Sequence, residues 1–230
     1  MSKLFKYFIV IFLSLFFSCV NSEQKQFPKI LDEYYEFNIS QNDDGLRMIN
    51  HQPKYIGILK DTIKIEHFLR PFNVKMPKES KLIVKENKFK KYFIEWNYKK
   101  SFKNLDSVRV EIKIDTTQVI SNENRKSYPV MFENHTKDTL AIGYGNVIPI
   151  ITEAKLDNGK WKTIEKPHGY FCDVGVQTII LPPKEILITN QIIYNGNFKT
   201  KLRMRIGKSI SQEFYGNITL TQINKVPNNQ

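Results

Sequence analysis

The sequence predicts an all-β protein whose main body is an antiparallel β-sandwich, preceded by a smaller strand-rich region and a polar N-terminal segment. Between residues 108 and 115, apolar and charged residues alternate strictly, as in a half-buried antiparallel strand. Beyond residue 121, short apolar stretches recur at regular intervals, with turn-forming residues between them. No stretch carries the periodicity of a long helix. These three observations favour a sandwich.

The strand-rich region is expected to cover residues 54–120. Its first two strands, residues 55–59 and 62–68, flank Lys60-Asp61, which we interpret as a two-residue hairpin turn although the usual Gly or Asn is missing. Six polar residues at 121–126 give the best internal boundary. The other strands predicted in this region are residues 82–84, 92–98 and 108–114.

Residues 121–230 are expected to form the sandwich itself. Turn signals such as Asp157-Asn158-Gly159 and Pro182-Pro183 separate the strands. The strands predicted here are residues 128–132, 139–144, 148–154, 161–164, 178–181, 185–194, 200–206 and 218–223.

Three short motifs in this region resemble those of bacterial Ig-like modules in envelope proteins. They are Asn-x-Thr-x-Asp-Thr-Leu at residues 134–140, Asp-x-Gly-x-Trp at 157–161 and Leu-Pro-Pro-x-Glu at 181–185. The Cys–Trp–Cys spacing of an antibody-type domain is absent. The resemblance implies a recognition or spacer module and brings no catalytic residues with it.

The N-terminus resembles the signal peptide of bacterial lipoproteins. Lys3 and Lys6 precede an apolar run at residues 7–17, which is shorter than the roughly 20 residues that a membrane span needs. Leu-Phe-Phe-Ser-Cys then ends at Cys19 and resembles a lipobox, although Phe16 departs from the smaller aliphatic residue of the pattern. An ordinary signal peptide or a membrane-anchored N-terminus is the alternative.

The lipoprotein resemblance has several implications. Residues 1–18 would be the signal peptide, and Cys19 would carry the acyl chains, palmitate among them, as the only attachment to the membrane. Val20, rather than Asp, follows this cysteine, which implies the outer membrane as the location. Residues 19–53 are polar and are expected to be a tether. Cys172 would be the only remaining thiol, so no intramolecular disulfide is expected.

The positive charge of the chain favours anionic partners. The formal net charge is +12, and it is +10 without the two lysines of the leader. Alternation in one late strand places Lys199, Lys201, Arg203 and Arg205 on one face, which makes them candidate anion-binding residues. Neutralisation by acidic residues of neighbouring strands is the alternative, as is a guard against edge-to-edge aggregation. Aromatic residues do not interleave with these cations along the strand, and the leader directs the chain out of the cytoplasm, so no nucleic acid partner is expected.

No cofactor, metal site or catalytic residue is predicted. His51, His67, His135 and His168 are far apart in the sequence. Cys172 has a histidine and an aspartate nearby, but we interpret it as a small packed side chain. The sequence therefore predicts a non-enzymatic, lipid-anchored envelope protein that binds or spaces another component. A lipoprotein enzyme or enzyme inhibitor whose site is assembled from distant loops is the alternative.

A sequon of Asp, Ser or Thr, and an apolar residue occurs four times and matches one used for O-glycosylation of bacterial envelope proteins. Asp-Thr before a strand is also ordinary turn chemistry, which is the alternative. The four candidate hydroxyls belong to Thr62, Ser107, Thr116 and Thr139.

Overall fold

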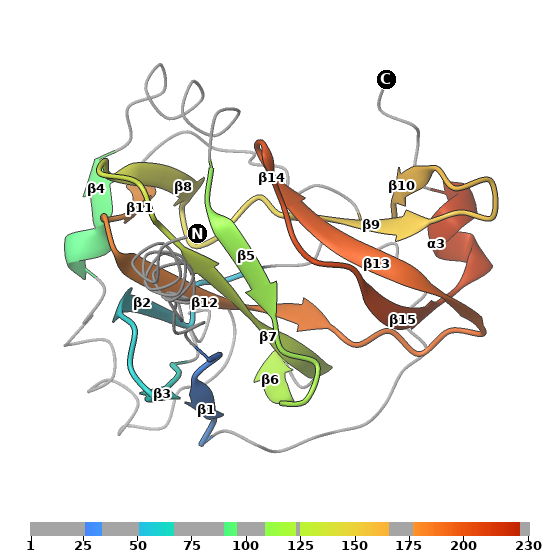
Figure 1. The fold of residues 1–230 in the computed structure, drawn as a ribbon, viewed down its shortest axis with the longest axis horizontal. Helices are drawn as coiled ribbons and strands as arrows, with labels where there is room; N and C mark the ends of the chain where they lie inside the picture. Colours follow the sequence, from blue (N-terminus) through green and yellow to red (C-terminus); the bar gives the residue numbers. More distant parts are fainter. Residues whose placement is uncertain are drawn as a thin grey trace, which may run out of the picture.

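A central five-stranded sheet organises the fold (Figure 1). The computed structural model describes residues 26–33, 51–66, 90–95, 109–122, 125–165 and 177–225. The order of the central sheet is β2–β12–β7–β5, and β6 also pairs with β7; all of these pairings are antiparallel. Its strands are β2 (Tyr55–Ile58), β5 (Glu111–Ile114), β6 (Ile120–Asn122), β7 (Arg125–Glu133) and β12 (Glu185–Ile192).

Two further antiparallel sheets complete the sandwich. One runs β10–β9–β13–β14, with β15 also paired to β13, and comprises β9 (Ile151–Lys155), β10 (Trp161–Thr163), β13 (Phe198–Ile206), β14 (Ser209–Ile210) and β15 (Phe214–Ile218). The other runs β4–β11–β8 and comprises β4 (Phe93–Glu95), β8 (Leu140–Tyr144) and β11 (Gln177–Leu181). The remaining elements are the parallel pair β1 (Lys29–Leu31) and β3 (Thr62–Lys64), the 3-10 turn η2 (Lys90–Tyr92) and the helix α3 (Leu220–Lys225).

The three antiparallel sheets share one apolar core. Phe132 of β7 and Leu187 of β12 pack in the same cluster as Ile142 of β8, Ile179 of β11 and Met204 of β13. All five side chains are fully buried. This arrangement confirms the predicted all-β, antiparallel, sandwich-type fold, while the Ig-like resemblance stays a prediction.

The two middle strands of the central sheet are buried on both faces. Alternate residues of a strand point to opposite faces, so Met131 and Ile188 face away from the main core. There they join a second apolar cluster with Ile63 and Ile65, and Phe27 and Ile30 pack against it. The pair β1–β3 therefore covers the outer face of the central sheet.

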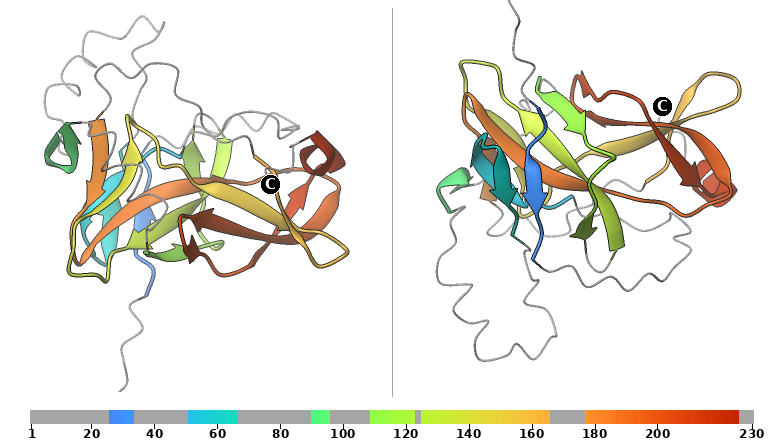
Figure 2. Two further views of the ribbon diagram at one scale, coloured as in Figure 1. Left: turned by 90° about the horizontal axis from the view of Figure 1, so that it is seen from above. Right: turned by 60° about the horizontal axis from the view of Figure 1, so that its bottom comes forward.

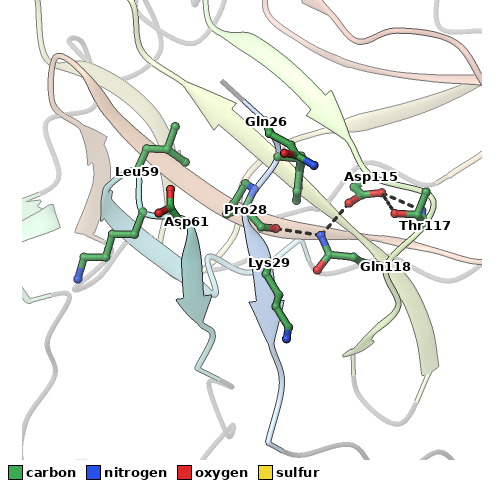
Figure 3. Close-up of a pocket in the computed structure, with 10 residues that line it drawn as sticks. Gln26, Pro28, Lys29, Leu59, Asp61, Asp115, Thr117 and Gln118 are labelled. Atoms are coloured by element: carbon green, nitrogen blue, oxygen red, sulfur yellow. Dashed lines mark hydrogen bonds between the residues drawn. The ribbon is translucent and has the colours of Figure 1, made fainter. Parts of the chain in front are cut away.

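The predicted tether differs from the structure, because residues 26–33 and 51–53 belong to the folded body. The Gln118 side chain accepts a hydrogen bond from Ile30 N at 2.7 Å and donates one to Pro28 O at 2.9 Å. Asp32 Oδ2 accepts from Ser121 N at 2.7 Å. These side chains occupy the free edge of β1, and Figure 3 shows Gln118 beside an open groove of about 930 Å³. Polar side chains, rather than a second strand, thus satisfy this edge.

The predicted division at residue 120 does not separate two sheets. β2 and β5 precede it in the chain, yet they pair with β12 and β7, which follow it. The hairpin predicted around Lys60-Asp61 is wrong, because β2 pairs with β12 while β3 pairs with β1. The strand predicted at 82–84 lies outside the described residues. The strands predicted from 92 to 206 each overlap an observed strand.

The last predicted strand, residues 218–223, is wrong beyond Ile218. Thr219, the residue before α3, caps its N-terminus reciprocally: its amide donates to Gln222 Oε1 at 2.8 Å, and its Oγ1 accepts from Gln222 N at 3.3 Å. This is a Thr-x-x-Gln capping box, a sequence signature that the alternation of Ile218 and Leu220 concealed.

Candidate functional site

The predicted cationic strand exists as β13, with the expected alternation. Leu202, Met204 and Ile206 are buried in the core, so the intervening side chains project to the opposite face. β13 lies between β9 on one side and β14 with β15 on the other. Its four cations therefore lie in the middle of a sheet face. Because β13 is not an edge strand, they do not guard an edge against aggregation.

Two acidic residues partly neutralise these cations, Glu153 on the neighbouring strand β9 and Glu213 just before β15, as one of the alternatives from the sequence expected. Lys201 Nζ lies 2.7 Å from Glu213 Oε2. Arg203 Nε and Arg205 Nε share Glu153, at 2.7 Å from Oε2 and 3.1 Å from Oε1 respectively. Glu153 is 7% exposed, so its charge depends on the two guanidinium groups.

Two aromatic rings lie among the cations, which sequence analysis missed because they belong to other strands. Arg203 lies over Trp161 of β10, with the guanidinium carbon 4.2 Å from the ring centroid, and Lys155 Nζ lies 5.8 Å from the same centroid. Lys199 Nζ lies 5.4 Å from the ring centroid of Tyr215, on β15. Cation–π contacts of this kind stabilise and orient the cations.

Strand register arranges these side chains in rows. Trp161 lies opposite Lys155, and Tyr215 lies opposite Lys201. Leu202 of β13 lies opposite Ala154 of β9. Because these strands are antiparallel, the residue before Leu202, Lys201, lies beside the residue after Ala154, Lys155. The row across the sheet therefore reads Trp, Lys, Lys, Tyr and spans three strand spacings, about 14 Å. We call this surface the cationic–aromatic face. Its members are Glu153, Lys155, Trp161, Lys199, Lys201, Arg203, Arg205, Glu213 and Tyr215.

The cationic–aromatic face carries a net positive charge. Five cations stand against two carboxylates, which leaves a formal charge of +3. The hydrogen bond between Lys201 and Glu213 raises the pKa of the lysine and lowers the pKa of the glutamate, so both are charged at neutral pH. Figures 1 and 2 place the strands of this face at the end of the long axis away from β1 and β3.

Two histidines acquire carboxylate partners that their sequence spacing did not predict. His51 Nδ1 donates to Asn190 O at 2.8 Å, and its Nε2 lies 3.3 Å from Glu165 Oε2. Tyr194 donates its hydroxyl to the other oxygen of Glu165. Burial raises the pKa of Glu165, but the hydrogen bonds and charge of His51 and the Tyr194 bond outweigh it and hold the pKa below its ordinary value. All three side chains are at most 4% exposed, so this network is part of the interior.

The second histidine, His135, lies near Glu111 and Glu133 in a group with the composition of a metal site. His135 Nε2 lies 2.7 Å from Glu111 Oε2 and 3.6 Å from Glu133 Oε2. Lys113 Nζ lies 3.1 Å from Glu111 Oε2 and 3.4 Å from Glu133 Oε2. The lysine ammonium therefore already provides a cation between the two carboxylates.

Several predicted positions lie outside the described residues, namely Cys19, His67, Ser107, His168 and Cys172. Thr62, Thr116 and Thr139 are exposed, so their hydroxyls are accessible. Asp115 also serves the turn that follows it, since its Oδ1 accepts from Thr117 N at 2.8 Å. O-glycosylation stays a prediction, which the intact mass of the native protein tests.

Within the described part of the chain, no helix is long and apolar enough to cross a membrane. Comparison with known proteins found no family model, no characterised protein and no solved structure that matches this chain.

Proposed function

We propose that the protein is a lipid-anchored, non-enzymatic component of the bacterial outer membrane, and that it binds an anionic envelope component through the cationic–aromatic face. The observation that supports binding is the net charge of +3 on an open sheet surface. Lys155 and Lys199 contribute most to it, because both have an aromatic partner and neither has a carboxylate within 4 Å among the described residues.

The two arginines also retain donors for a ligand. Each uses its Nε for Glu153, and no described residue occupies the terminal amino groups of Arg203 or Arg205. A guanidinium presents its remaining donors as a planar fork that matches a carboxylate or phosphate. Because Glu153 holds both groups in place, an anion would meet donors that are already oriented, which lowers the entropic cost of binding.

The lipid anchor rests on the leader and on Cys19. Cys19→Ser is expected to move the protein from the membrane fraction to the soluble fraction of lysed cells. Retention of this variant in the membrane fraction would overturn the anchor.

Binding is tested with immobilised polyphosphate as the anionic probe and the variant Lys155→Gln/Lys199→Gln. These two lysines are preferred to the arginines, whose removal would leave the buried Glu153 unpaired and would destabilise the sheet. The matched control is Lys29→Gln/Lys60→Gln, which removes two exposed lysines outside the cationic–aromatic face. We expect salt-sensitive binding that the control retains and the test variant loses. Equal binding by both variants would contradict a role for this face.

A further inference from the structure

We infer that the cationic–aromatic face binds an acidic polysaccharide, a linear chain of sugar rings that carry carboxylate groups. This inference rests on the proposed function and names its ligand class. It goes further because it assigns a role to the two aromatic rings, which an anion alone does not require.

The rings are placed where a polymer would meet them. Tyr215 is 61% exposed although it is a large aromatic side chain, and it projects from the face that carries the cations. Trp161 lies at the other end of the same row, with Lys155 and Lys201 between the two rings. Aromatic side chains with one apolar and one wet side are favoured at binding surfaces. A ligand that satisfies this row must offer apolar ring surface at both ends and negative charge between them.

The dimensions favour a chain over a small solute. The row spans about 14 Å across the strands, and the four cations of β13 extend about 20 Å along it, because alternate residues of a strand lie about 6.6 Å apart. Small ligands bind in concave pockets that enclose most of their surface. This face is an open sheet surface, so an extended polymer that bridges several cations and both rings is the better fit.

A single-stranded nucleic acid also combines rings and charge, and it is the competing class of macromolecule. Base stacking uses the flat face of an aromatic ring. Here Arg203 lies over Trp161 and Lys199 lies over Tyr215, so a cation already lies against one face of each ring. A carboxylated sugar chain can instead contact these cations with its carboxylates while its rings pack beside the aromatic side chains. The export signal in the leader favours the same choice.

The experiment measures the affinity of the purified protein for four probes at one low ionic strength by titration calorimetry. Polygalacturonate offers sugar rings with carboxylates, dextran offers neutral sugar rings, polyphosphate offers charge without rings, and oligothymidylate represents nucleic acid. We expect polygalacturonate to bind most tightly per anionic group and dextran not to bind. Tyr215→Ala should weaken polygalacturonate binding about tenfold and change polyphosphate binding by no more than about twofold.

Ile58→Ala is the control, because it truncates a side chain that is 67% exposed on another sheet. Circular dichroism of each variant verifies its fold. Equal affinity for polygalacturonate and polyphosphate, with no effect of Tyr215→Ala, would overturn the polysaccharide inference and leave the proposed anion binding intact. Tightest binding of oligothymidylate would overturn it in favour of nucleic acid. Binding of none of the three anions would overturn the proposed function as well.

Discussion

Glu165→Gln is expected to destabilise the protein by about 3 kcal/mol at neutral pH. Glu165 is 3% exposed and His51, its partner at 3.3 Å, is 2% exposed. Removing the charged partner of a buried hydrogen bond costs about 3 kcal/mol or more, because the group that remains stays buried without its partner. The glutamine oxygen can still accept the hydrogen bond from Tyr194, so the lower end of that range is expected.

This loss should depend on pH in a defined direction. The folded pKa of Glu165 is below its ordinary value of 4.5, because hydrogen bonds from His51 and Tyr194 outweigh the effect of burial. A lowered folded pKa stabilises the folded state above the unfolded pKa, and this contribution is lost as the pH falls through the folded value. The difference between the wild type and Glu165→Gln should therefore shrink progressively below pH 4.5.

Urea unfolding followed by circular dichroism, repeated from neutral to acidic pH, measures both effects. Glu33→Gln is the control, because Glu33 pairs with Lys64 where both side chains are about 60% exposed, and surface pairs contribute at most about 1 kcal/mol. If the two variants lost the same small amount of stability, the buried contact between Glu165 and His51 would not have the role given to it. A loss that stayed constant across the pH range would refute the direction of the pKa shift.

Three further predictions concern the stability of the folded domain that carries the cationic–aromatic face. Phe132→Ala should lower the free energy of unfolding, measured by urea unfolding, by about 3–5 kcal/mol, because Phe132 is fully buried in the central sheet. The control Ile58→Ala should lower it by no more than about 0.5 kcal/mol, because Ile58 is exposed. Gly196→Ala should cost about 1–3 kcal/mol in the same assay, since a Cβ there would lie 2.0 Å from the Ile218 carbonyl carbon. Gln118→Ala removes two hydrogen bonds that hold the edge of β1, so amide exchange of residues 29–31 should accelerate about tenfold or more, whereas unchanged exchange would show that β3 alone holds this strand.

Period-two alternation predicted β5 and β13 because their burial is set by one local pattern. Arg205 and Lys201 could be assigned to the outward face in the same way. The partners of a strand are different, since pairing depends on contacts between distant segments. β12 pairs with β2, more than a hundred residues earlier, and nothing local to either strand specifies this. The hairpin predicted at Lys60-Asp61 fails for the same reason, because strands that are close in the sequence need not pair.

The candidate site was also only partly predictable, because strand pairing between distant segments brings some of its residues together. Its cations were predictable, while its rings were not, because Trp161 and Tyr215 reach the face only through the registers of β10 with β9 and of β15 with β13. The error at α3 was avoidable. Thr219 and Gln222 have the spacing of a capping box, which is a stronger local signal than the apolar alternation around them.

The docking of β1 sets how far the body can move from its proposed anchor. Six residues separate Cys19 from Gln26, the first described residue, so the connection can extend no more than about 25 Å. A free chain from Cys19 to residue 53 would reach about 120 Å. A short linker confines the folded domain to a thin layer above the lipid and raises its effective concentration in that layer. The cationic–aromatic face lies toward the end of the long axis away from β1, so a captured polymer would be held on the part of the body away from the anchored strand (Figures 1 and 2).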